Sequence, residues 1–272
     1  MLVTFLIGLA VTALWLSARC GLYHLSLYSS TPGAASTLAD VPAVQDPAVT
    51  LTNGHPIFPV PIQCVGAYAG GALTLTRAQL TTPKLRAITP TNLRPLDVVA
   101  VPSSRPPLIE YFRHPIGLNP IDENQVLAST SAIAATPLLI AILFGDGNFN
   151  VPPGDMFTIH ASQSIATVAN AWTAGNITLD QPLPAGRYAV VGMDTFGTGE
   201  VFSRLIFPNQ VWRPGNLAGA TAAFIGSRYA RWGNLGVLGE FESFAQPQLD
   251  CFNQTGGAQT VDLMMDIIKI SG

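Results

Sequence analysis

Residues 145–155 hold the side chains best suited to bind a metal ion. Their sequence, GDGNFNVPPGD, opens with the alternating Asp, Asn and Asn of a calcium-binding loop. The motif is then broken, because Val151 stands where the loop requires glycine and Phe157 where a bidentate glutamate belongs. One interpretation is a plain loop turn, and the other is a calcium ion that bridges two subunits. The candidate calcium ligands are Asp146, Asn148, Asn150 and Asp155.

Other residues suited to chemistry are scattered along the chain. Glu240 and Glu242 stand two apart in an expected strand, so their carboxylates share one face, which suits acid–base chemistry or a solvated or intersubunit surface. The sequence contains no HExxH, GxSxG, Walker or GxGxxG motif. The histidines, none of which has a partner at metal-ligand spacing, are His24, His55, His114 and His160. We therefore expect no catalytic site, no cofactor and no enzymatic activity.

Aromatic and sulfur-containing side chains leave two alternatives open. The aromatic residues Trp172, Trp212, Tyr229 and Trp232 could form a sugar-binding platform, although anchors in a core or a subunit interface are the commoner use. The cysteines are sparse and odd in number, with no CxxC spacing, so we expect buried thiols and at most one disulfide. They are Cys20, Cys64 and Cys251.

Composition favours a protein whose surface is largely covered. Of its 272 residues only 11% are charged and 48% are hydrophobic, whereas about a quarter charged is usual for a soluble domain. Other subunits, a membrane, or both are the candidate covers. The net charge is −3 and no Lys/Arg-rich arm is present, so binding of nucleic acid through charge neutralisation is not expected.

Strand signals dominate the chain, and the clearest lie within residues 176–207. There Ile177–Leu179, Arg187–Met193 and Val201–Phe207 are short runs rich in β-branched and aromatic residues, bounded by Gly and Pro. Further strands are expected at 73–79, 84–88, 97–101, 138–144, 156–162, 222–228, 237–244 and 260–270. Residues 121–135 are the best internal helix candidate, since acidic residues stand in the first turn.

Residues 1–20 are expected to form a hydrophobic helix. The run LVTFLIGLAVTALWLSA, residues 2–18, is uncharged and close to the length that crosses a bilayer. We favour a retained helix that touches or enters a lipid bilayer or is buried in a subunit interface. The alternatives are packing inside its own domain and a signal peptide. The expected membrane or interface residues are Leu2, Phe5, Leu6, Ile7, Leu9, Leu14, Trp15 and Leu16.

Residues 21–62 are expected to form an extended arm on a neighbouring surface, because small residues and spaced prolines cannot build a core. From residue 63 onward the strand signals predict an all-β domain. A hydrophobic arm, an inserted helix and the pattern LPAGRYAVVG…RLIF…RPG before a closing strand resemble a viral jelly-roll capsid protein. The nearest likeness is to capsid proteins of small icosahedral bacterial viruses that enclose a membrane.

That resemblance implies a jelly-roll β-sandwich over 63–272, in which two antiparallel sheets pack face to face. A single roll is favoured, and a compact double roll dividing near 145–150 is the alternative. It also implies a shell subunit of a virion that self-assembles into homo-oligomers, with residues 1–20 directed at lipid. A membrane-anchored β-sandwich that binds carbohydrate or protein, and an enzyme of unrecognised type, are the other hypotheses.

Overall fold

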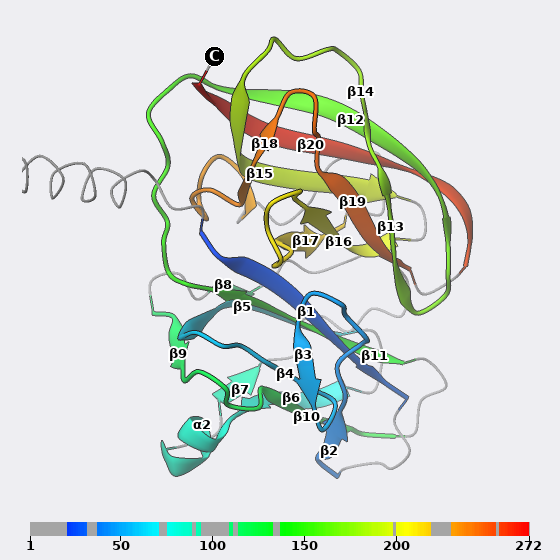
Figure 1. Cartoon of the computed structure of the whole chain (residues 1–272). Coiled ribbons are helices and arrows are strands. Elements are labelled where there is room, and N and C mark those ends of the chain that lie inside the picture. The colour runs from blue at the N-terminus through cyan, green and yellow to red at the C-terminus, as the bar shows by residue number, and fades with distance from the viewer. Residues whose placement is uncertain are drawn as a thin grey trace, which may run out of the picture.

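The computed structural model describes residues 21–31, 37–70, 75–88, 91–93, 109–110, 114–132, 137–197, 200–218, 230–253 and 256–271. In these residues the protein is all-β, as predicted, and its strands pair in antiparallel ladders. Four larger sheets and one small hairpin form two groups, which lie one above the other in Figure 1. Among the described helices none is long and apolar enough to cross a membrane. The expected helix over residues 1–20 lies outside the described residues.

The first sandwich uses strands between Tyr23 and Gly145. Its sheet 1 has the order β1-β11-β5-β8, and β9 also pairs with β5; its sheet 2 has the order β2-β10-β6-β7. Sheet 1 consists of β1 (Tyr23–Ser30), β5 (Ile62–Gly70), β8 (Ile109–Glu110), β9 (Ile116–Leu118) and β11 (Leu138–Gly145). Sheet 2 consists of β2 (Ala39–Val41), β6 (Leu75–Thr81), β7 (Thr91–Leu93) and β10 (Gln125–Thr130). The hairpin β3 (Thr50–Thr52) and β4 (His55–Ile57) and the helix α2 (Pro83–Ile88) complete this half.

The second sandwich uses strands between Met156 and Ser271. Its sheet 3 has the order β14-β12-β20-β15-β18, and its sheet 4 has the order β13-β19-β16-β17. Sheet 3 consists of β12 (Met156–Thr167), β14 (Thr178–Leu179), β15 (Arg187–Gly197), β18 (Gly239–Glu242) and β20 (Gly257–Ser271). Sheet 4 consists of β13 (Ala171–Asn176), β16 (Glu200–Ile206), β17 (Gly215–Leu217) and β19 (Gln248–Asn253).

Both sandwiches have the same strand order. If the accessory strands β3, β4, β9 and β14 are set aside, each half has a first sheet made of its first, last, third and sixth strands. The second sheet of each half is made of its second, seventh, fourth and fifth strands. Within the described residues no ladder joins a strand of one half to a strand of the other, and the pairing divides in the connection 146–155.

Sheet 1 is buried on both of its faces. In β11 the side chains of Leu139, Ala141 and Leu143 belong to the core shared with the second sandwich. The alternate side chains Ile140 and Ile142 point instead into the core between sheets 1 and 2. This arrangement explains the continuous apolar run LLIAILF, because a strand buried on both faces gains from apolar side chains in each direction.

The structure corrects three sequence predictions. Residues 125–130, expected within a helix, form β10, in which Val126, Ala128 and Thr130 are buried in alternation. The period of two thus overrides the acidic residues before it. Residues 84–88, expected as a strand, form α2, which Pro83 starts and which the Thr82 side chain caps by accepting from the Leu85 amide.

The third correction concerns residues 21–62, the expected extended arm. This range carries β1 to β4, and β1 is an integral strand of sheet 1 that pairs with β11 from Tyr23 to Ser30. Tyr23, Leu25 and Leu27 face the second sandwich, while Tyr28 faces sheet 2. The physical reason is that the apolar residues of YHLSLY lie on both faces of one buried strand.

Candidate functional site

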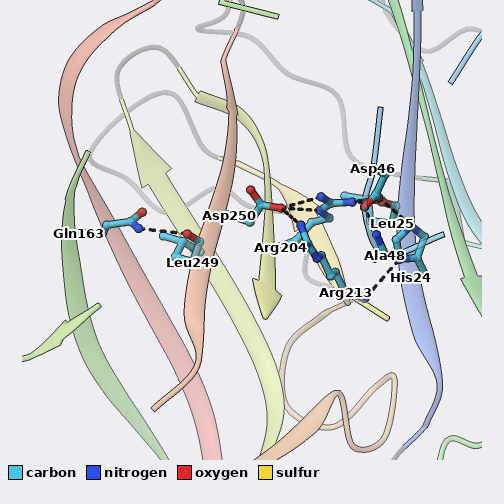
Figure 2. Close-up of polar contacts among 9 residues, drawn as sticks. All are labelled: His24, Leu25, Asp46, Ala48, Gln163, Arg204, Arg213, Leu249 and Asp250. Atoms are coloured by element: carbon cyan, nitrogen blue, oxygen red, sulfur yellow. Dashed lines mark hydrogen bonds and ion pairs between the residues drawn. The ribbon is translucent and has the colours of Figure 1, made fainter. Parts of the chain in front are cut away.

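A buried ionic network joins the two sandwiches, and Arg204 stands at its centre (Figure 2). Arg204 lies in β16, and its side chain is fully enclosed. Its Nε and Nη2 atoms donate to Asp250 Oδ2 over 3.2 and 2.6 Å, and Asp250 lies on the neighbouring strand β19. The same acceptor receives Nη1 of Arg213 at 2.8 Å. This half of the network belongs entirely to the second sandwich.

The other half of the network comes from the first sandwich. Nη1 of Arg204 donates to the carboxylate of Asp46 and, over 3.3 Å, to the carbonyl oxygen of Leu25 in β1. His24 Nε2 lies 3.1 Å from Asp46 Oδ2, and its Nδ1 accepts from the Arg213 amide at 3.2 Å. That acceptor role assigns the imidazole proton to Nε2. Asp46 also accepts from the amide of Ala48.

Charge balance allows this network to be buried. Two guanidinium groups face two carboxylates, so the network is neutral when His24 is neutral. Complete burial lowers the pKa of His24 below its usual value, against the raising effect of Asp46. Although burial alone would raise it, the pKa of Asp46 is held well below its usual range by His24 and Arg204. The Arg204 guanidinium also lies 3.6 Å from the centre of the Trp172 ring.

This arrangement suits a fixed junction better than a reaction centre. Each charged group is engaged by another, and Arg204 and Asp250 are closed off from solvent. A buried ion pair adds little net stability, yet breaking one is costly, so such networks fix geometry. In this protein the network fixes how β1 and the loop that carries Asp46 pack against β16 and β19. Sequence analysis missed the network; the one signal is a lone arginine in the apolar strand VFSRLIF.

A second charged cluster holds residues 230–238 against sheet 3, on the face that points away from sheet 4. Arg231 Nε and Nη2 donate to the carboxylate of Asp266 over 2.7 and 2.9 Å, and the Trp232 amide donates to the same group. Asp194 lies farther from Arg231, at 3.7 Å. Burial raises the pKa of Asp194 to about 6; the Asp266 carboxylate adds to the rise, and the attraction of Arg231 opposes it. The Asp266 pKa is lowered despite burial, by hydrogen bonds from Arg231 and its neighbours.

The candidate calcium ligands lie in the connection 146–155, which forms a loop as expected. The Asp146 side chain accepts from the Asn148 amide at 2.9 Å, and Asn148 Oδ1 accepts from the Asn150 amide and side chain at 3.3 and 2.8 Å. These oxygens therefore stabilise the turn itself. Asp155 is exposed beside β12. In the described part of the chain no group of three or more His, Cys, Asp or Glu residues is arranged to hold a metal ion.

Glu240 and Glu242 border a shallow pocket of about 420 Å³. Glu240 pairs with Arg187 across β15 and β18, while Leu22, Phe207 and Gln210 contribute the other walls. The two carboxylates do share a strand face, as expected, but the neighbouring arginine neutralises Glu240. The pocket thus holds an ion pair in which Arg187 is half exposed and Glu240 is mostly buried.

The histidines do not gather. His160 lies on the surface of β12, where its Nδ1 is 2.6 Å from Asp180 and its Nε2 is 3.4 Å from Asp262. His55 contacts Asp40 in the first sandwich, and His114 is exposed. Cys64 and Cys251 are buried thiols in different sandwiches.

The described tryptophans do not share a face. Trp212 is buried in the first sandwich against Phe58, although in sequence it lies between β16 and β17 of the second sandwich. Trp172 packs on Phe252 and is covered by Arg204. Trp232 is 54% exposed on the outer side of sheet 3. Tyr229 and the expected membrane residues from Leu2 to Leu16 lie outside the described residues.

Comparison with known proteins identifies no family for this chain. No family model matches the chain, and no curated protein sequence matches it. A solved structure described as "Crystal Structure of the STIV MCP", a major capsid protein, aligns over 90% of this chain and 97% of its own at 11% identity, with a TM-score of 0.23. A TM-score this low does not establish a shared fold, so strand order and side-chain packing are the grounds for the proposal below.

Proposed function

We propose that this protein is a structural subunit of a viral capsid, built from two jelly rolls in one chain. The observation that supports it is the strand order shared by the two sandwiches. Jelly rolls are eight-stranded, with two four-stranded sheets made by two Greek keys, and viral capsids are a common use of them. The first-last-third-sixth and second-seventh-fourth-fifth orders of the two sandwiches are those expected of such a roll, and they support this proposal. The proposal takes the two-roll alternative in place of the single roll favoured on sequence.

Packing between the rolls supports a rigid building block. Apolar side chains of sheet 1 and the second sandwich form one continuous core, and the Arg204 network crosses the same junction. A shell subunit must hold its shape against many neighbours, and a large apolar junction prevents the relative motion that is otherwise expected between domains. The engagement of the buried charged groups with one another supports a structural role without catalysis.

Composition supports extensive contact with other molecules. With only 11% charged residues, the surface is poorly suited to remain fully solvated. The proposed partners are further copies of this chain, in closed trimers or pentamers, and a lipid membrane reached through residues 1–20. The proposed location is the virion shell. Sequence-specific binding of nucleic acid is no part of the proposal.

Negative-stain electron microscopy combined with light scattering on the purified full-length protein tests this function. A shell subunit is expected to give closed isometric particles or stable trimers or pentamers whose mass does not change with detergent. A detergent-dependent monomer would refute the proposal and favour the anchored binding module. A glycan screen would then follow.

A further inference from the structure

Exposed apolar side chains gather at one end of the molecule. This end, called the exit end here, is where β1, β5, β12 and β15 begin and where β20 finishes. The strand registers establish it: Tyr23 pairs with Gly145, and Met156 with Ile268. Leu22, which precedes β1, lines the same pocket as Arg187, the first residue of β15. The starts of both rolls therefore lie together, on the left in Figure 1.

The apolar residues of the exit end sit on loop tips from both rolls and from their connection. Val211 is 71% exposed and Phe244 86% exposed, while the least exposed member, Val60, is 36% exposed. Phe244 stands in the turn between β18 and β19, where the Ala245 amide donates to the Glu242 carbonyl. The six tip residues are Val60, Ile121, Val151, Met156, Val211 and Phe244.

Ile121 keeps its side chain exposed at this end although its backbone conformation is unfavourable. It is 70% exposed and has a φ of 65°, a left-handed conformation that β-branched residues rarely adopt. A hydrogen bond from its amide to the Phe58 carbonyl, 2.8 Å long, holds it there. A large apolar side chain held outward in this way is typical of a contact surface.

The described part of the chain begins at this end, at Gly21, which is called the exit point here. The Gly21 amide donates to the Val237 carbonyl over 3.0 Å, which fixes the position of that residue. The preceding run, residues 2–18, carries no charged side chain. From the tips and the exit point together we propose that the exit end rests on a lipid bilayer, with the tip residues in its interface. This inference rests on the membrane contact proposed above, and it assigns the face that makes the contact.

Separate loop tips favour lipid over a second copy of the chain. A stable protein interface needs about 800 Å² of complementary surface on each partner, whereas a bilayer interface accepts isolated apolar side chains at any spacing. Charge selects the kind of lipid. Among the described residues of the loops and strand ends there, carboxylates outnumber cations even when Glu240, the partner of Arg187, is left aside, so zwitterionic headgroups are favoured over anionic ones. The carboxylates are Asp122, Glu123, Asp155 and Glu242, against the cations Arg187 and Lys269.

The opposite end of the second sandwich provides a matched control. Val168 follows β12 at the end where Thr167 pairs with Gly257, and it is 61% exposed. It resembles Val211 in side chain and exposure and differs in position. If the exit end contacts lipid, Val211 should enter the bilayer interface and Val168 should not.

The test uses full-length protein carrying one polarity-sensitive fluorophore. A Cys20→Ser background leaves the buried thiols Cys64 and Cys251, and Val211→Cys, Phe244→Cys or Val168→Cys supplies the labelled site. Phosphatidylcholine vesicles with nitroxide-bearing acyl chains are the probe. Labels at 211 and 244 are expected to shift to the blue and to be quenched roughly threefold more than the label at 168, because only the exit end enters the interface.

Each other outcome would overturn the inference. Equal quenching at 168 and 211, or none at either, would show that the exit end has no preference for lipid. A blue shift at 211 that develops without vesicles, as the protein oligomerises, would assign this end to contacts between copies. Particle formation is scored separately by microscopy, so loss of the shell function would leave the quenching pattern unchanged.

A second measurement uses substitutions without labels. Combined Val211→Asp and Phe244→Asp changes are expected to lower the vesicle partition coefficient by roughly tenfold, since two apolar tips are removed from the interface. Val168→Asp is expected to leave it unchanged. The melting temperature of each variant verifies folding, and an equal loss for both variants would contradict the proposal.

Discussion

Arg204 of β16 donates to the carboxylate of Asp46, a residue of the other sandwich that is 158 positions away in the chain. Arg204 and its second carboxylate partner, Asp250, are enclosed, and the pair with Asp46 forms a polar bridge through an otherwise apolar junction. A misplaced second sandwich would leave these charges buried without partners. The bridge thus specifies one seating of the two sandwiches.

Replacing Arg204 with methionine is expected to lower the free energy of unfolding by roughly 3–5 kcal/mol, because two buried carboxylates lose their shared partner. Urea unfolding of the full-length protein measures the loss. Arg187→Met is the control: the Arg187 side chain is 52% exposed, against 0% for Arg204, so a smaller loss of about 1 kcal/mol is expected. Similar losses for both variants would show that Arg204 does not fix the junction.

Acid is expected to destabilise the protein through His24. Its pKa is lower in the folded than in the unfolded chain, so below pH ~6.5 the unfolded state takes up the proton first. Stability is therefore complete above that pH and is lost as the pH falls through it. Urea titrations at several pH values measure the slope. A His24→Gln variant is expected to be less sensitive between pH ~7 and ~5, and an unchanged slope would exclude His24 as the cause.

Asp194 is expected to act in the opposite direction. Its folded pKa of about 6 lies above the unfolded value, so the folded chain holds the proton more tightly and stability falls as the pH rises from ~4 through 6. The shift corresponds to about 3 kcal/mol at neutral pH. Asp194→Asn should recover roughly 1–3 kcal/mol there, part of the gain being offset by the lost contact with Arg231.

The neighbouring carboxyl is the control for that prediction. Asp266 has a lowered pKa, so its stabilising effect is present at neutral pH and is lost on acidification. Asp266→Asn is expected to destabilise the protein at pH 7, where Asp194→Asn stabilises it. Chemical denaturation of both variants in one buffer measures the two signs, and the same sign for both would refute the assignment.

Tyr188 is expected to be a core anchor of β15. Its ring stacks on Phe241 with 5.7 Å between centroids, and its hydroxyl donates to the Pro184 carbonyl. Tyr188→Ala should cost roughly 3–5 kcal/mol of stability. Tyr188→Phe removes only the hydrogen bond and should cost about 1 kcal/mol. A loss below ~0.5 kcal/mol for the alanine variant would contradict the inward orientation of the ring.

Deleting residues 1–20 is expected to impair membrane attachment or assembly. The two sandwiches should remain folded, because their strands begin at Tyr23 and pair with one another. Vesicle flotation and particle counts measure the loss, and circular dichroism measures folding. A deletion that floats and assembles like the full chain would exclude an anchoring role.

Much of the fold was predictable because its strongest local signals agree with it. The strands predicted at 138–144, 156–162 and 260–270 are confirmed as β11, β12 and β20. The first two are runs of apolar or alternating residues between turn residues. Residues 260–270 also fit a helical period, and there the β-branched content and the preceding Gly256-Gly257 turn favour the strand. Residues 121–135 misled because Asp122 and Glu123 suit a helix start, yet burial of every second residue of β10 decided the structure.

The ionic junction was not predictable in the same way. Its members, among them Asp46, Arg204 and Asp250, are far apart in sequence and meet only once both sandwiches are formed. Each looks ordinary in its own neighbourhood. The same holds for the tip residues Ile121 and Phe244, since exposure depends on where a loop lies in the finished fold.

Sheet 1 has apolar side chains on both faces, and this makes the two halves dependent on each other. If residues 21–145 were produced alone, Leu25, Leu139 and Leu143 would lie bare on an open sheet, ready to associate with any similar surface. The two sandwiches therefore share a strand order, but neither is expected to fold stably without the other. We expect the chain to unfold as one cooperative unit, and residues 21–145 produced alone should aggregate instead of forming a working module.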